Sequence, residues 1–310
     1  MPLKTRTNLI HILRNVLLVR GQDVSSSEAM TLRPSEMQDE ILDAFVAMTN
    51  ERFGRDPSGV MEGTDTLEEI AVAIQRSPQI SRPVLRRVMR PVKRPARRVV
   101  MIPGLHGCSL GFSRLASFVP DDGEVVAWEH PGLDESGPVP RTIDEIADTI
   151  ASIEIERGAD CPLELLGYCI GGLIAHEVSH RLLDAGFDVS RLLLIDAHTA
   201  RAMREAGLSR RLQVLGPIEL AKARFKGVIE HRLVRIGVSQ LKAVFNHVDR
   251  RVDVDVSVVR TGGELAFGPL ELETWSDVAR SVELIRIPDV GHVELFRGRH
   301  EHRLERLLAG

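Results

Sequence analysis

Short apolar runs alternate with amphipathic segments from about residue 98 to the end of the chain. Runs of branched aliphatic residues predict strands, and apolar residues three and four positions apart predict helices. The expected strands are residues 98–102, 124–129, 163–168, 191–195, 253–260 and 282–287. The expected helices are residues 109–118, 143–156, 170–185, 273–280 and 293–308. This alternation favours an α/β fold with a mostly parallel sheet covered by helices on both faces.

Three segments depart from the alternation. Residues 1–77 show only helical patterns, so we expect a small all-α domain there. Its helices are expected at about residues 6–19, 35–53 and 65–76. Residues 78–97 mix prolines with arginines, which is typical of a semi-rigid linker; a basic strip that docks an acidic partner is the alternative. Within the α/β domain, residues 98–310, the helical segment 200–249 is interpreted as a lid, or else as a plain connecting pair of helices.

The sequence Gly-Tyr-Cys-Ile-Gly-Gly at 167–172 lies between an expected strand and an expected helix. Glycines on both sides of Cys169 let the backbone turn sharply and approach its neighbours closely. The pattern is that of the nucleophile elbow, Gly-x-Ser-x-Gly, with cysteine where serine usually stands. It predicts that Cys169 is a nucleophile for acyl transfer. The other cysteines, Cys108 and Cys161, are expected to be inert apolar residues.

Two later strand ends offer the partners that such a nucleophile needs. Asp196 follows the strand after the elbow helix, and His292 follows the last strand in a Gly-His step. The carboxyl ends of parallel strands share one edge of the sheet, and the order nucleophile, acid, histidine is that of this elbow. We expect Cys169 to attack a carbonyl, His292 to take and return the proton, and Asp196 to orient the imidazole. The alternative for Asp196 is a plain strand-end or helix-capping aspartate, and His198, the rival histidine, is expected at a surface or supporting position.

An oxyanion hole requires two backbone N–H groups aimed at the developing charge. Ile170, the residue after the nucleophile, is expected to supply one of them. The other should come from the loop after strand 98–102, where we choose Leu105, with His106 as the alternative. That loop has no Gly-x-Gly-x-x-Gly and no Lys-Ser/Thr pair, so it does not predict phosphate binding.

Composition narrows the class of protein. A hydrophobic share of 43% predicts a globular chain, while a net charge of −4 and 4% aromatic residues argue against nucleic-acid binding. Three cysteines in no zinc or disulfide spacing fit a reduced, cytoplasmic setting. Near the start, His11 and Arg14 interrupt the apolar stretch, which indicates an amphipathic helix and neither a signal peptide nor a membrane span. We expect no metal and no bound cofactor, and no pattern predicts the oligomeric state.

From about residue 98 to the end, the chain resembles the thioesterase domains of polyketide synthases and nonribosomal peptide synthetases. The matching stretches are Met101–Gly104, Glu129–Asp134, Thr142–Ala147, the elbow, Leu193–Asp196 and Gly291–His292. The resemblance implies an α/β-hydrolase fold with a lid. It also implies an acyl chain on the phosphopantetheine of a carrier protein or synthase module as substrate, and its hydrolysis or cyclisation as the outcome.

Residues 50–54 and 66–71 resemble parts of the acyl- or peptidyl-carrier domains that precede such thioesterases. Carriers need an attachment serine, and the matching position falls near Asp39, where no serine stands; Ser35 is four residues early. The resemblance thus implies a carrier-like domain that cannot be loaded and that serves docking or scaffolding. An unrelated helical domain is the alternative.

A cysteine nucleophile changes the expected chemistry. Transfer from pantetheine to Cys169 gives another thioester, so the acyl group stays activated, whereas serine would give a less reactive oxyester. We therefore expect cyclisation or transfer to be favoured over simple hydrolysis. The rival functions are an esterase or acyl-CoA hydrolase of the same fold, and a non-catalytic adaptor that docks on a synthase.

Overall fold

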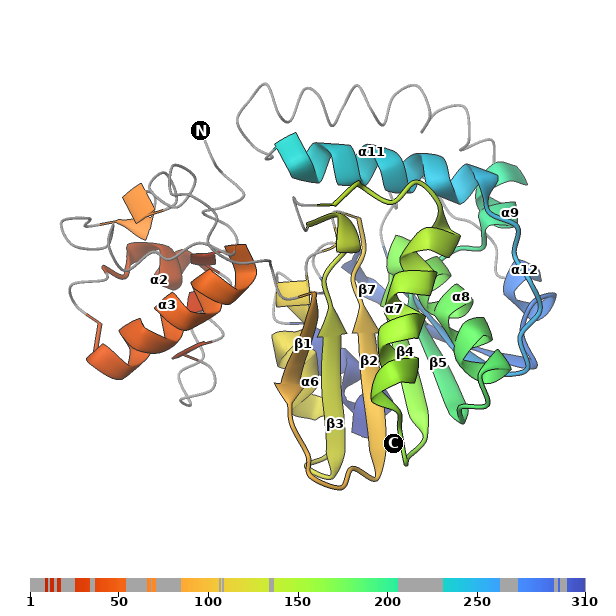
Figure 1. The fold of residues 1–310 in the computed structure, drawn as a ribbon, viewed down its shortest axis with the longest axis horizontal. Helices are drawn as coiled ribbons and strands as arrows, with labels where there is room; N and C mark the ends of the chain where they lie inside the picture. The colour runs from red at the N-terminus through yellow and green to blue at the C-terminus, as the bar shows by residue number, and fades with distance from the viewer. Residues whose placement is uncertain are drawn as a thin grey trace.

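A computed structural model of the chain defines the fold (Figure 1). The residues that it describes are 9–10, 12–13, 16–17, 26–33, 37–53, 66–67, 69–70, 85–105, 107, 109–133, 137–205, 231–262, 273–292, 295 and 300–309. Several expected segments therefore lie wholly or mostly outside the described residues. These are the middle of the lid segment, most of the helix at 65–76 and much of the helix at 293–308.

Seven strands of the described residues form one sheet. They are β1 (Arg86–Arg90), β2 (Arg97–Ile102), β3 (Gly123–Trp128), β4 (Leu163–Tyr168), β5 (Val189–Ile195), β6 (Asp255–Gly262) and β7 (Ser281–Gly291). Their order across the sheet is β1-β3-β2-β4-β5-β6-β7. β1 is antiparallel to β3, and every other neighbouring pair is parallel. The predicted α/β class is thus confirmed, and the six expected strands are found within a few residues of their predicted ends.

Helices cover both faces of this sheet. α7 (Ile143–Arg157) and α8 (Ile170–Asp184) lie on the face towards the viewer in Figure 1, and α6 (Ser113–Phe118) lies behind it with α14 (Glu305–Ala309). Short turns η2 (Ser109–Phe112), η3 (Pro131–Leu133) and η4 (Glu301–Leu304) and helix α12 (Glu273–Ser276) complete this part. Successive side chains of a strand point to opposite faces. Val100 accordingly packs in the core under α7 and α8, and Val99 packs in the core on the other face.

β1 lies inside the segment that the sequence suggested as a linker. Prolines and arginines interrupt the apolar pattern by which a strand is predicted. Even so, β1 pairs with β3 and forms the edge of the sheet. Arg86 forms an ion pair of 2.8 Å with Glu154 of α7, whose second oxygen lies 3.5 Å from Arg98. Trp128 also donates a hydrogen bond of 2.9 Å to Glu154. Residues 86–90 are therefore an edge strand, and Arg86 is used inside the fold.

Glu154→Gln should destabilise the protein by about 3–5 kcal/mol, because it leaves the buried Arg86 guanidinium without its counter-charge. The Glu154 side chain is fully buried and the Arg86 side chain nearly so. Urea unfolding followed by circular dichroism would measure the free energy of unfolding. The matched control is Asp255→Asn, which breaks an exposed pair with Arg280 and should change stability little. Equal effects of the two substitutions would contradict the prediction.

The N-terminal described residues pack around a core of their own. The helices with defined bounds are α2 (Ser26–Thr31), which the sequence analysis missed, and α3 (Asp39–Phe53), which falls within the expected helix 35–53. Leu9, Leu13 and Phe45 are buried together in this core. The amphipathic spacing near the start of the chain thus predicted a buried face. Within the described part of the chain, no helix is both long and apolar enough to cross a membrane.

Two helices of the expected lid are described, α9 (Ala200–Glu205) and α11 (His231–Asn246). α11 lies across the edge of the sheet where the parallel strands end (Figure 1). Its Ile236 is buried against Leu133 of η3 and Val139. The helix is therefore held over the carboxyl ends of the strands by apolar contacts, and its role as a lid stays a prediction.

Candidate active site

The three residues proposed for catalysis lie at the carboxyl ends of parallel strands. Cys169 follows β4, Asp196 follows β5 and His292 follows β7. The strand order changes direction at β2, which lies between β3 and β4 in the sheet. Ligand sites of open α/β sheets form outside the strand ends at such a switch point.

Cys169 occupies a sharp turn between β4 and α8. Its φ of 56° and ψ of −126° are unusual for a residue other than glycine, and such strain persists only where neighbours enforce it. The Cys169 N–H donates to Ile195 O at 2.8 Å, which ties the turn to β5. A Cβ on Gly171 would lie 2.3 Å from Pro103 O, and one on Gly172 would lie 2.2 Å from the Ala197 Cβ. The glycines after Cys169 are thus required by close packing, as the sequence predicted.

Asp196 and His292 form a hydrogen-bonded pair. His292 Nδ1 lies 3.0 Å from Asp196 Oδ2, and Asp196 is only 3% exposed. Thr261, at the end of β6, donates to both carboxylate oxygens, from its N–H at 2.8 Å and from its hydroxyl at 2.6 Å. The carboxylate is therefore fixed from two strands and holds the imidazole by one ring nitrogen.

Electrostatics favour the charged forms of this pair. Burial raises the pKa of Asp196, but hydrogen bonds from His292 and Thr261 outweigh it and leave the pKa below its usual value. Burial lowers the pKa of His292, but hydrogen bonds with the side chains of Asp196 and Cys169 raise it to about 9. The His292 ring thus lies between the Asp196 carboxylate and the Cys169 side chain, and the catalytic roles of the three residues stay predictions.

Tyr168 and Thr261 support the histidine and the carboxylate, and the sequence analysis singled out neither. The Tyr168 ring stacks on His292 with centroids 4.7 Å apart, and its hydroxyl donates to His292 O at 2.9 Å. Tyr168 directly precedes Cys169, so the elbow motif contained the signal. Thr261 could be found only by knowing that β6 lies next to β5.

His198 is not at the surface. It is 7% exposed, and its Nδ1 accepts a hydrogen bond of 3.1 Å from Arg260. Burial and the charge of Arg260 lower the pKa of His198 to about 3, so the ring is neutral at physiological pH. His198 therefore lies at the supporting position that the sequence analysis allowed, because His292 makes the hydrogen bond to Asp196.

The two expected oxyanion donors flank the nucleophile. Ile170 is the first residue of α8, where N–H groups have no acceptor within the helix. Leu105 follows Gly104, whose added Cβ would lie 3.1 Å from the Cβ of Cys169. Both residues thus lie next to the elbow, and their roles remain predictions. The alternative donor, His106, lies outside the described residues, as does Cys108.

The fold and the site together define an α/β-hydrolase fold with cysteine, histidine and aspartate at its strand ends. Residues 97–237 match the family model described as Thioesterase domain. Erythronolide synthase EryA3 of Saccharopolyspora erythraea is 31% identical over 87 residues. That stretch is 28% of this chain and 3% of the relative, so the chain corresponds to a small part of that protein.

Solved structures share the fold. The Vlm2 thioesterase domain, bound with a dodecadepsipeptide, has a TM-score of 0.57 at 23% identity over 71% of this chain and 95% of that one. The type II thioesterase BorB from the borrelidin biosynthetic cluster has a TM-score of 0.57 at 19% identity over 72% and 96% of the two chains. The four-domain nonribosomal peptide synthetase AB3403 has a TM-score of 0.69 at 16% identity, over 99% of this chain and 26% of that one.

Proposed function

We propose that this protein is a thioesterase that releases an acyl or peptidyl chain from the phosphopantetheine thioester of a carrier protein. The observation that carries the proposal is the hydrogen-bonded set of Asp196, His292 and Cys169 at a strained elbow. The match of residues 97–237 to the Thioesterase domain supports the substrate class. The shared fold of synthase thioesterases agrees with it.

In the first step, the proton of the Cys169 thiol passes to His292, and Sγ attacks the carbonyl carbon of the thioester. The negative charge moves to the carbonyl oxygen, where the N–H groups of Leu105 and Ile170 stabilise it. The carbon–sulfur bond to pantetheine then breaks, and His292 gives its proton to the departing sulfur. Asp196 holds the ring in the required tautomer and stabilises its positive charge. The products are an acyl-Cys169 thioester and free pantetheine thiol.

In the second step, a hydroxyl or amine of the chain, or water, attacks the acyl-Cys169 carbonyl. His292 accepts the proton of the attacking group, and the Cys169 thiolate leaves. Because acyl-Cys169 is itself a thioester, it remains activated for ring closure or for transfer to another acceptor. We therefore favour cyclisation or transfer over hydrolysis.

The partner in this proposal is an acyl or peptidyl carrier protein or a synthase module. Residues 1–77 would dock or scaffold as a carrier-like domain that lacks the attachment serine. The alignment with AB3403, a four-domain synthetase, extends over 99% of this chain and agrees with that arrangement. We further propose a cytoplasmic location and no resident organic cofactor, since the substrate brings its own pantetheine arm.

The experiment is to mix the protein with acyl-pantetheine thioesters of several chain types and to record the intact mass over time. A mass increase of one acyl group that decays to released product is expected. Product analysis then separates ring closure, transfer and hydrolysis. Equal turnover of free esters would favour an esterase instead, and equal turnover of acyl-CoA would favour an acyl-CoA hydrolase. No acylation by any substrate would favour an adaptor.

A further inference from the structure

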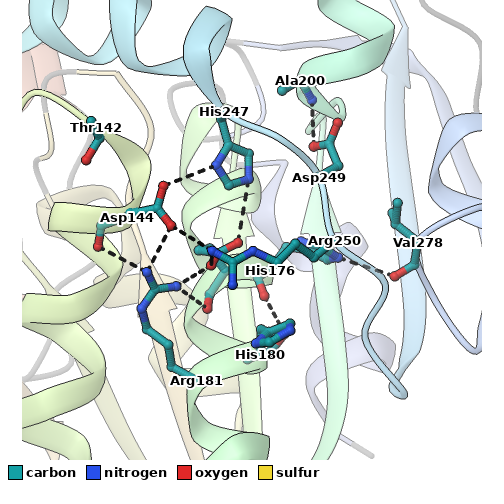
Figure 2. Close-up of polar contacts among 12 residues, drawn as sticks. Thr142, Asp144, His176, His180, Arg181, Ala200, His247, Asp249, Arg250 and Val278 are labelled. Carbon is teal, nitrogen blue, oxygen red and sulfur yellow. Dashed lines mark hydrogen bonds and ion pairs between the residues drawn. The ribbon is translucent and has the colours of Figure 1, made fainter.

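A second cluster of polar side chains lies away from the catalytic set, where α11 ends against α7 and α8 (Figure 2). Asp144 comes from α7, Glu177 from α8, and His247 directly follows α11. One ligand atom from each residue can be chosen so that all three lie within 4.8 Å of one another. The cluster therefore joins one end of the expected lid to the two helices that cover the sheet.

Two of these residues bury polar atoms that nothing satisfies. Glu177 is 0% exposed and His247 is 4% exposed. Glu177 Oε2 and both ring nitrogens of His247 have no hydrogen-bond partner in the described part of the chain. His247 Nε2 lies 3.6 Å from Glu177 Oε2, and its Nδ1 lies 3.9 Å from Asp144 Oδ2, which is too far for direct hydrogen bonds. Buried polar atoms without partners are costly and call for an explanation.

Arg181 and Arg250 bind the opposite oxygens of the same carboxylates. Arg181 lies 3.0 Å from Asp144 Oδ1 and also bonds Glu177 Oε1. Arg250 lies 3.2 Å from Asp144 Oδ1 and 3.4 Å from Glu177 Oε1. The guanidinium groups thus fix both carboxylates while leaving Asp144 Oδ2 and Glu177 Oε2 turned towards the imidazole. Hydrogen-bonded carboxylates of this kind are typical around bound metal ions.

The charge around His247 leaves room for a cation. The two ring nitrogens of His247 face carboxylate oxygens of Glu177 and Asp144 at 3.6 and 3.9 Å. The acidic groups facing the cluster are Asp144, Asp148, Glu177 and Asp249, and the basic groups are Arg181, Arg204 and Arg250. Negative charge is thus in excess by one.

We propose that Asp144, Glu177 and His247 bind a divalent transition-metal ion, zinc above all. The ligands would be Asp144 Oδ2, Glu177 Oε2 and one ring nitrogen of His247. Tetrahedral zinc with nitrogen and oxygen ligands places them roughly 3.4 Å apart, close to the 3.6 Å between Glu177 Oε2 and His247 Nε2. Asp144 Oδ2 lies 3.9 Å from the other ring nitrogen, so the Asp144 side chain would have to move closer to complete the site. The side chain of Asp144 is 42% exposed, so an ion can enter from that side and keep water in the remaining position.

Such a site would link three helices. A metal ion there would fasten the end of α11 to α7 and α8, so its loss would loosen one end of the expected lid. This inference does not depend on the proposed thioesterase activity. It departs from the expectation of a metal-free protein, because the three ligands come from distant helices with no recognisable spacing in the sequence.

The test is zinc binding by the full chain after treatment with a chelator, in the Cys169→Ala background so that this thiol cannot contribute a ligand. Isothermal titration calorimetry should show that one equivalent of zinc binds. Cobalt bound in its place should give the visible absorption of a four-coordinate site. Zinc should also raise the melting temperature. His247→Gln should lower the zinc affinity at least about tenfold and abolish the rise in melting temperature.

The matched control is His180→Gln on α8, where the ring pairs with Asp184 at 3.0 Å and faces none of the proposed ligands. It should bind zinc like the parent. Asp144→Asn changes the half-exposed ligand and should also weaken zinc binding. It provides a second test in case the His247 variant fails to fold. No zinc uptake by the parent, or unchanged affinity in His247→Gln and Asp144→Asn, would overturn the proposal. NMR that finds the His247 ring protonated at neutral pH without metal would also overturn the proposal. The positive charge of the ring would then balance the carboxylates without a metal ion.

Discussion

Cys169→Ala should lower kcat/KM for an acyl-pantetheine thioester by about 10⁶-fold and leave no covalent acyl-enzyme. The elbow places this thiol beside the His292 ring, and the proposed mechanism forms the acyl bond on its sulfur. Stopped-flow release of pantetheine thiol and intact-protein mass would measure the two effects. The fold should persist, because alanine keeps the backbone turn and removes only the sulfur.

The control for this variant is Cys161→Ala. Cys161 is a half-buried free thiol just before β4, so it lies at the opposite edge of the sheet from Cys169. Its replacement should leave the rate and the acyl-enzyme unchanged. Acylation that survives in Cys169→Ala and disappears in Cys161→Ala would show that the elbow does not carry the nucleophile.

Cys169→Ser separates the role of the elbow from the role of sulfur. Serine keeps the position in the turn, so an acyl-enzyme should still form, now as an oxyester. Because the oxyester is less activated, the ratio of cyclised or transferred product to free acid should fall relative to the parent enzyme. An unchanged ratio would mean that the lid and the chain, and not the thioester, decide the outcome.

The layered fold could be read from the sequence because burial on both faces of a parallel sheet gives continuous apolar runs. β1 could not, because its sequence is Arg-Arg-Val-Met-Arg and follows prolines. Its arginines are compatible with a strand only because Glu154, far along the chain on α7, neutralises Arg86. A partner of that kind cannot be seen in a local pattern.

The same reasoning separates the site residues that were foreseen from those that were not. Cys169, Asp196 and His292 each follow a strand, and parallel strands end at a common edge, so their approach could be expected. Thr261 becomes a partner of Asp196 only because β6 pairs with β5. His198 is buried where Arg260, on that neighbouring strand, donates a hydrogen bond to its ring. Contacts between residues on adjacent strands of a sheet produce no recognisable spacing in the sequence.

Asp196→Asn should lower kcat by about 10⁴-fold, because the amide no longer stabilises the imidazolium or fixes its tautomer. It should also change the pH dependence. In the parent protein the pKa of His292 is raised to about 9, so the ring keeps its proton up to that pH. Above it, the ring cannot protonate the departing pantetheine sulfur, and kcat/KM should fall.

Loss of the Asp196 charge removes the first of the interactions that raise the pKa of His292, so the pKa should move down towards its ordinary value of 6.5. The descending limb of the kcat/KM profile should follow it to lower pH. The free energy of unfolding should also decrease as the pH rises. The contribution of the pair is fully present below about pH 6.5 and is lost as the pH rises through about 9.

Kinetic profiles from pH 5 to pH 10 and NMR titration of the His292 ring would measure the shift in both proteins. Asp289→Asn is the control, because Asp289 lies three residues before His292 but pairs with Arg303 at the surface. Its profile should match that of the parent protein. A descending limb that stays near pH 9 in Asp196→Asn would mean that the bond of 3.0 Å is not what holds the proton on His292. The charge next to the ring would then come mainly from the Cys169 sulfur, and the pair of Cys169 and His292 would act without its carboxylate.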